Sequence, residues 1–161
     1  MGIVRSSIEN MINTSKSEST EQQVVEMYLG DMAEEWLGHE LDRDAKIWLA
    51  DGVHIEPDLF SEKGNIICEV YAHIGTLKVG QQHKISQDIL KMILLDKCTG
   101  KTYRKLIIIA DEKVENQLKG LSFIAESIRR FGIEIKRIEL PEDIKKSVCQ
   151  AQKRQIMVNT K

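Results

Sequence analysis

The sequence has few cysteines and prolines, few aromatic residues and no long hydrophobic run. Cys68, Cys98 and Cys149 are odd in number and far apart, a pattern that indicates neither a zinc site nor a disulfide framework. No apolar stretch reaches the roughly 18 residues expected of a membrane span. The N-terminal residues also lack the apolar core of a secretory signal. We therefore expect no membrane partner and a cytoplasmic location.

Several catalytic motifs are also missing. The sequence contains no P-loop, no GxGxxG, no HExxH and no nucleophile elbow, so it does not match the corresponding nucleotide-binding, metalloprotease and hydrolase patterns. A chain of 161 residues, of which 42% are hydrophobic, is suited to one domain. We expect a polar segment or short helix over residues 1–19. A single domain should then cover 20–161 and end in a basic tail.

Charge is unevenly distributed along the chain. Residues 1–60 hold four Lys/Arg and thirteen Asp/Glu, a net charge of −9, whereas 61–161 hold nineteen and twelve, a net charge of +7. Such a division is able to orient a polyanion toward one face, although each single cluster also fits an ordinary solvated helix.

Hydrophobic periodicity predicts alternating helices and strands. A helix is expected over 21–41, capped by Thr20 and Gln23. Strands follow over 45–52 and 53–60, joined at Asp51-Gly52, and a buried strand lies over 66–74. A helix over 79–98, a buried strand over 104–112, a helix over 114–132 and a strand over 133–140 complete the order, before a short terminal helix and tail. This order predicts an α/β fold with a mixed sheet.

Two carboxylates stand at corresponding places on the predicted hairpin. Asp58 follows Pro57, and Glu69 lies in the next strand. Neighbouring strands bring facing residues to about 5 Å, where two carboxylates repel unless a cation lies between them. Mg²⁺ or Mn²⁺ prefers such oxygen ligands and activates a bound water toward phosphorus.

This element order, with Pro57-Asp58 on one strand and Glu69 on the next, resembles the PD-(D/E)XK superfamily of restriction-endonuclease-like nucleases over about residues 20–140. The resemblance implies a three-layer α/β/α sandwich with a central mixed sheet and Mg²⁺-dependent cleavage of DNA. It also implies that the carbonyl of Val70 binds the metal together with Asp58 and Glu69. A homodimer would be one way to reach two DNA strands.

The chain departs from the family pattern at one position. Tyr71 stands where the family carries a lysine that stabilises the charged transition state. Some members place this lysine on the following helix, which points to Lys84, then to Lys91. Asp88, between them, could orient Lys84. The alternative is an exposed helix stripe of ordinary ion pairs.

Other candidates are weaker. The family's first helix often carries a glutamate that faces the site, which indicates Glu34, or else Glu35. Tyr71, His73 and Gln87 are further possible polar contacts. We expect a nuclease, with two alternatives: a catalytically inactive protein of the same fold that binds or assembles, or a small α/β protein with an unrelated role.

Overall fold

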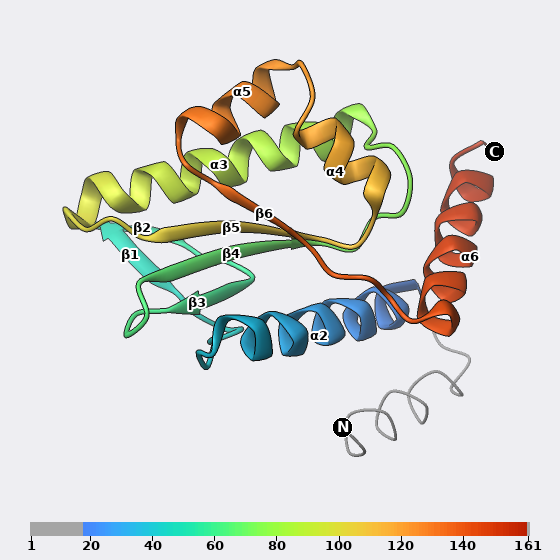
Figure 1. Cartoon of the computed structure of the whole chain (residues 1–161), viewed down its shortest axis with the longest axis horizontal. Coiled ribbons are helices and arrows are strands. Elements are labelled where there is room, and N and C mark those ends of the chain that lie inside the picture. Colours follow the sequence, from blue (N-terminus) through green and yellow to red (C-terminus); the bar gives the residue numbers. More distant parts are fainter. Residues whose placement is uncertain (1–17, 161) are drawn as a thin grey trace.

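The computed structural model of the chain describes residues 18–160, and its centre is a four-stranded mixed sheet (Figure 1). Its strands lie in the order β3 (Leu59–Ser61), β4 (Ile66–Tyr71), β5 (Arg104–Ile109) and β6 (Glu134–Arg137). β3 and β4 are antiparallel, and the other two pairs are parallel. All of β4 and nearly all of β5 are buried, as continuous apolar runs predict for strands covered on both faces. The predicted mixed α/β class is confirmed.

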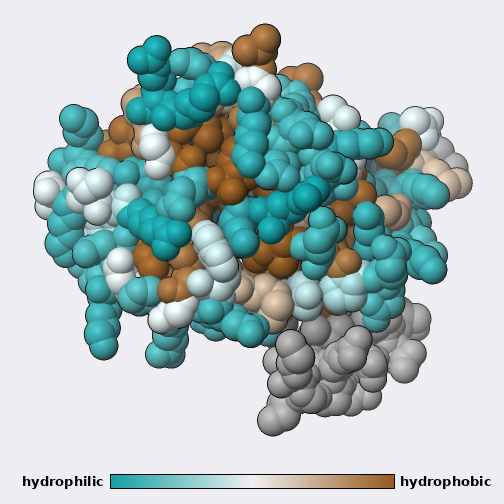
Figure 2. Space-filling view, in the orientation of Figure 1, coloured by the Kyte–Doolittle hydropathy of each residue, from teal (hydrophilic) through white to brown (hydrophobic). Residues whose placement is uncertain are grey.

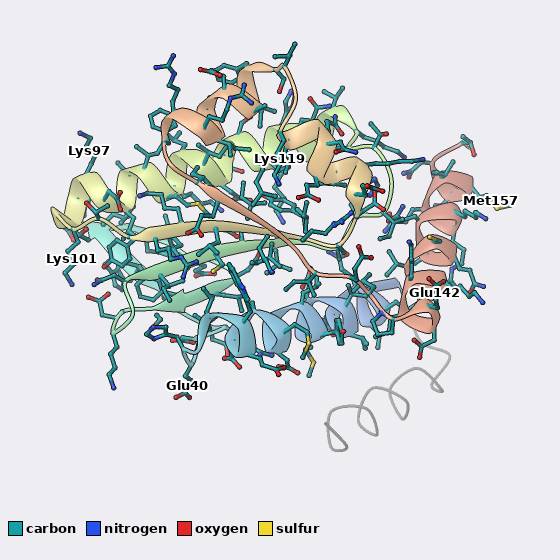
Figure 3. All side chains as sticks on the ribbon, viewed as in Figure 1. Glu40, Lys97, Lys101, Lys119, Glu142 and Met157 are labelled. Atoms are coloured by element: carbon teal, nitrogen blue, oxygen red, sulfur yellow. The ribbon has the colours of Figure 1, made fainter. Side chains whose placement is uncertain are left out.

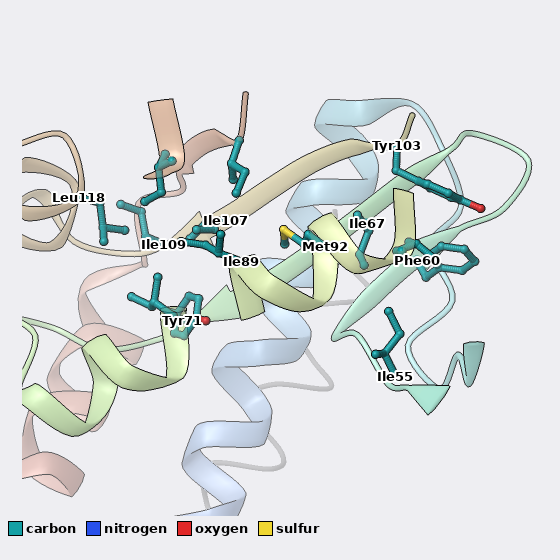
Figure 4. Close-up of a cluster of buried hydrophobic side chains, with 14 of the residues drawn as sticks. Ile55, Phe60, Ile67, Tyr71, Ile89, Met92, Tyr103, Ile107, Ile109 and Leu118 are labelled. Atoms are coloured by element: carbon teal, nitrogen blue, oxygen red, sulfur yellow. The ribbon is translucent and has the colours of Figure 1, made fainter. Parts of the chain in front are cut away.

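Helices cover both faces of this sheet. α3 (Val79–Thr99), α4 (Glu112–Leu118) and α5 (Phe123–Arg130) lie on one face, and α2 (Glu18–Leu37) lies on the other, with α6 (Glu142–Asn159) at its end (Figure 1). Because side chains alternate along a strand, Ile107 of β5 enters the cluster under α3 and Ile108 enters the cluster under α2. Figure 4 shows the first cluster, with Ile107, Ile109 and Tyr71 among its buried side chains.

A separate hairpin precedes the main sheet. Within the part of the chain that the structure describes, β1 (Ile47–Ala50) and β2 (Val53–Ile55) pair only with each other, across a turn in which Gly52 has a φ of 72°. The single strand predicted over 53–60 is therefore wrong: the chain leaves β2 and starts β3 at Leu59. Pro57 lies in the break and has no N–H to donate to a ladder.

Two helix predictions need correction, and a third is not tested. The first helix is already formed at Glu18, before the predicted cap at Thr20, and it ends at Leu37, where Gly38 adopts a φ of 68°. The helix predicted over 114–132 is two helices, because the Ser122 hydroxyl accepts a hydrogen bond from Ala125 N–H and starts α5. Residues 1–17, which include the helix expected within 1–19, lie outside the described residues.

The last segment is a longer helix than predicted. α6 runs over Glu142–Asn159 and buries Ile144 and Val148. Its Gln152 amide donates to Ile74 O and accepts from Ile74 N–H, both at 2.9 Å. Contacts of α6 with the sheet and with α2, which single-sequence periodicity does not reveal, therefore stabilise this helix.

Candidate metal centre

The structure brings Asp58 and Glu69 together across β3 and β4. The pairing of Leu59 with Cys68 sets the register, so the preceding residue, Asp58, stands opposite Glu69. Asp58 Oδ2 accepts a hydrogen bond from Val70 N–H at 2.7 Å, and Asp58 N–H donates to Glu69 Oε2 at 3.4 Å. Both residues lie near the carboxyl end of β4, the end of a parallel strand where open α/β sheets bind ligands.

Glu69 is a deeply buried carboxyl group of this site. Its residue is 2% exposed, and Oε1 is buried without a hydrogen-bond partner among residues 18–160. Burial raises the pKa of Glu69 to about 9, helped by the negative charges of Asp58 and Asp88, while the charge of Lys91 works in the opposite direction. In the absence of a cation, burial therefore favours the protonated form of Glu69.

Asp88, on α3, is the third carboxylate of the cluster. It is 1% exposed, accepts a hydrogen bond from the Tyr71 hydroxyl, and binds Lys91 Nζ at 2.7 Å through its other oxygen. Burial, followed by the hydrogen bond to Asp88, raises the pKa of the Tyr71 hydroxyl above its ordinary value. The Tyr71 hydroxyl therefore remains neutral, donates its hydrogen bond to Asp88 and supplies no positive charge.

The two candidate lysines lie in different surroundings. Lys91 contacts Asp88, and its charge affects the pKa of Glu69. Burial opposes the charge of Lys91, but the hydrogen bond and charge of Asp88 outweigh burial and raise its pKa. Lys84 is exposed, with Nζ 5.3 Å from the centroid of the Tyr71 ring. Asp88 thus orients Lys91, whereas the sequence suggested that it orients Lys84.

Other predicted site residues have local partners. Glu34 Oε1 accepts a hydrogen bond from Leu41 N–H at 2.8 Å, and Glu34 Oε2 lies 3.4 Å from Arg43 Nη2. Glu34 therefore holds the segment that follows α2 against this helix. His73 bonds Thr76 O through Nε2 and the Gln81 amide through Nδ1. Both ring nitrogens are therefore occupied. Burial lowers the pKa of His73 and favours its neutral form.

Glu35 and Gln87 are exposed on α2 and α3. Neither is among the residues that line the hollows described next. The contacts in the structure give no preference for either as a site residue.

Three hollows adjoin along this edge of the molecule. The one that Asp58 lines, the central hollow, has a volume of about 600 Å³. It shares Glu26 and Val70 with a hollow of about 190 Å³ that Tyr71 and Lys84 line. The central hollow also shares Arg43, Ala45 and Lys46, from the segment before β1, with a third hollow of about 990 Å³. We refer to these three adjoining hollows as the groove; Asp58 lines its central part, whereas the buried Glu69 lines none of it.

Glu26 of α2 is a candidate that the sequence analysis missed. It lines both hollows that flank Val70, and its Oε1 accepts a hydrogen bond from the Gln22 amide at 3.0 Å. The expectation of a glutamate on the first helix was applied near the end of that helix, at Glu34. Glu26 lies two turns earlier, beside the buried Val25, and helical periodicity relative to that buried face could have suggested it.

The donor set at Asp58 fits a small divalent cation in part. Within residues 18–160, no group of three or more His, Cys, Asp or Glu side chains is arranged to hold a metal ion. The N–H of Val70 points to Asp58, and the N–H and C=O of one strand residue face the same neighbour. The Val70 carbonyl, the Asp58 carboxylate and the unpartnered Glu69 Oε1 are therefore the oxygen ligands that such an ion would find, with water completing its shell.

Comparison of the chain with models of known protein families, with curated proteins and with solved structures finds no match. None of the helices within residues 18–160 has the length and apolar character needed to cross a membrane.

Proposed function

We propose that this chain is a Mg²⁺-dependent phosphodiesterase that acts on DNA and has a restriction-endonuclease-like fold. One observation carries the proposal. Glu69 holds a buried, unpartnered carboxyl oxygen beside Asp58, and Asp58 lines a hollow of about 600 Å³. A buried polar atom without a partner is costly in a folded protein. Its retention is understandable if a ligand completes the site, and strongly perturbed pKa values are found mainly at functional sites.

The residues of the site have distinct roles in this proposal. Asp58, Glu69 and the Val70 carbonyl hold the ion, which when bound supplies an activated water and neutralises phosphate charge. The hydrogen bond from Val70 N–H fixes the Asp58 carboxylate. Tyr71 fixes one oxygen of Asp88, and Asp88 in turn holds the Lys91 ammonium near the carboxylate pair. Lys91 is therefore favoured over Lys84 as the cation that stabilises developing negative charge.

The alternative is a catalytically inactive protein of the same fold that serves in binding or assembly. Tyr71 at the lysine position, with its hydroxyl committed to Asp88, favours this alternative. The raised pKa of Glu69 also agrees with it, because a protonated Glu69 beside Asp58 is stable without metal. Both interpretations use the same residues. They differ in whether a cation displaces the proton of Glu69.

A cleavage assay with matched variants distinguishes the two. Plasmid and single-stranded DNA are incubated with the wild type in Mg²⁺, Mn²⁺ or EDTA, while calorimetry measures Mn²⁺ binding. Asp58→Asn preserves an acceptor for Val70 N–H but removes the charge. Asp51→Asn, in the exposed β1–β2 turn, is the control. We expect metal-dependent cleavage that Asp58→Asn abolishes together with metal binding, while Asp51→Asn retains both.

Two results would count against the proposal. Metal-dependent cleavage that persists in Asp58→Asn would mean that the nuclease activity resides elsewhere. A wild type that binds no metal and cleaves neither substrate would support the inactive alternative.

A further inference from the structure

The hairpin of β1 and β2 presents an exposed tryptophan beside the groove. Trp48 is 60% exposed, whereas Ile47, Leu49 and Ile55, from the other face of the hairpin, belong to or pack against the cluster under α3. Isolated apolar residues at a surface are common. Trp48 itself lines none of the three hollows, but the preceding residues Lys46 and Ile47 do. The hairpin is thus anchored on one face and carries its largest side chain on the other.

Positive charge accompanies this ring. Lys46 Nζ lies 5.1 Å from the centroid of Trp48, and Lys46 also lines both the central hollow and the hollow of about 990 Å³. His54, the cross-strand partner of Trp48, packs on it with ring centroids 4.9 Å apart and a tilt of 55°. An aromatic face beside a flexible cation, at the wall of a groove, is the pairing that proteins use to bind single-stranded nucleic acid.

The second tryptophan differs in its position in the fold. Trp36 of α2 is 44% exposed, but its ring lies against two cations, Lys136 at 4.4 Å and Arg104 at 5.3 Å. Neither Trp36 nor the two cations on its ring line any of the three hollows, whereas Lys46, the cation on the Trp48 ring, lines two of them. Trp36 is therefore a matched control for Trp48, with the same side chain and similar exposure in a different place.

We propose that Trp48 stacks on an unpaired base of the DNA strand while Lys46 contacts a neighbouring phosphate. The substrate would then be single-stranded, or a duplex with an unpaired segment near the scissile bond. This inference rests on the proposed function for the identity of the ligand as DNA.

The position of the hairpin in the chain limits where this base lies. His54, which pairs with Trp48, precedes Asp58 by four residues, so their Cα atoms are at most about 14 Å apart. The stacked base therefore lies within a few nucleotides of the carboxylate pair.

Tryptophan fluorescence tests the stacking directly. Trp36→Phe leaves Trp48 as the sole tryptophan, and Trp48→Phe leaves Trp36. Each variant is combined with Asp58→Asn and titrated with oligo-dT, or with a duplex of equal length, in EDTA. We expect oligo-dT to quench the emission of Trp48 and leave that of Trp36 unchanged, with much weaker quenching by the duplex.

Affinity gives a second readout. Trp48→Ala should weaken oligo-dT binding by about 5- to 150-fold, the range for one base stacked on an aromatic side chain. Trp36→Ala should have no effect. Lys46→Ala should lower the slope of log K against log salt by about 1, because one cation no longer neutralises a phosphate. Near-UV circular dichroism verifies that each variant is folded.

The outcomes separate this inference from the proposed function. Because binding is measured without metal and with Asp58→Asn, quenching of Trp48 by oligo-dT supports stacking even if the wild type cleaves nothing. Equal quenching of both tryptophans, stronger quenching by the duplex, or unchanged affinity in Trp48→Ala would overturn the stacking even if the wild type is an active nuclease.

Discussion

Replacement of Glu69 by glutamine should remove a pH dependence from the stability of the protein. Glu69 has a pKa of about 9 in the folded protein, compared with an ordinary value of 4.5. Between these values the folded protein keeps a proton that the unfolded chain releases. A raised pKa therefore contributes stability fully below pH 4.5 and loses it as the pH rises toward 9.

The size of the effect follows from the proton difference. One proton held by the folded protein and not by the unfolded chain changes the free energy of unfolding by about 1.4 kcal/mol per pH unit. From pH 5 to pH 8 the wild type should therefore lose up to about 4 kcal/mol of stability through this group. Glutamine carries no charge at any pH. The stability of Glu69→Gln relative to the wild type should rise by the same amount.

Urea unfolding in metal-free buffer at pH 5, 6, 7 and 8 measures this difference. Glu40→Gln is the control because Glu40 is exposed in the segment after α2 (Figure 3), and its profile should follow that of the wild type. Parallel profiles for the wild type and Glu69→Gln, within about 0.5 kcal/mol, the usual range for surface substitutions, would show that Glu69 titrates as an ordinary carboxyl group. The argument from its burial would then be wrong.

Three further predictions concern catalysis, DNA binding and packing. Lys91→Met should lower turnover by about two to three orders of magnitude, and by more than Lys84→Met does. The control, Lys97→Met near the end of α3 (Figure 3), should leave turnover unchanged. Full activity in Lys91→Met would remove Lys91 from the mechanism. DNA affinity should fall steeply with added salt because phosphate contacts release counterions, and a titration that is indifferent to salt would contradict a DNA-facing groove. Gln152→Ala should lower the free energy of unfolding in urea by about 1–3 kcal/mol, because the N–H and C=O of Ile74 are left without their partners. Gln150→Ala, at an exposed position, is the control. If Gln152→Ala lowers the free energy of unfolding no more than Gln150→Ala does, this contact is dispensable.

The sequence was most informative where local pattern and burial agree. The apolar runs of β4 and β5 and the alternation of β6 predicted strands, and the turn at Gly52 joined a hairpin as expected. The hairpin register also brought Asp58 opposite Glu69. Each of these features is determined either by contacts between residues close in sequence or by the burial of a continuous apolar run.

Predictions were weaker where contacts between segments distant in sequence determine the structure. The length of α6 depends on Gln152 and Ile74, which are 78 positions apart. The choice between Lys84 and Lys91 depends on which turn of α3 crosses Glu69, and a helical pattern leaves that open. Helical periodicity could have suggested Glu26, but the structure adds that Glu26 lines the same two hollows as Val70.

The surface gave less information than the buried cluster. Figure 2 shows mainly hydrophilic side chains on the face seen in Figure 1, with hydrophobic ones visible between them. The difference of charge between the two parts of the sequence therefore does not identify a binding face by itself. The residues that line the groove come from both parts of the sequence. Lys46 belongs to residues 1–60, with a net charge of −9, and Lys84 belongs to residues 61–161, with a net charge of +7.

The charge balance of the buried cluster connects stability with function. Asp58, Glu69 and Asp88 are three carboxyl groups, and Lys91 is the ammonium that contacts them through Asp88. If all three carboxyl groups were ionised, this cluster would carry two uncompensated negative charges in a region that water reaches poorly, which is energetically costly. A proton on Glu69 removes one of these charges, whereas a divalent cation removes both. The same imbalance that raises the pKa of Glu69 would thus attract a metal ion. In the proposed function, a proton at this site at pH 7 corresponds to the inactive protein, and a metal ion corresponds to the enzyme.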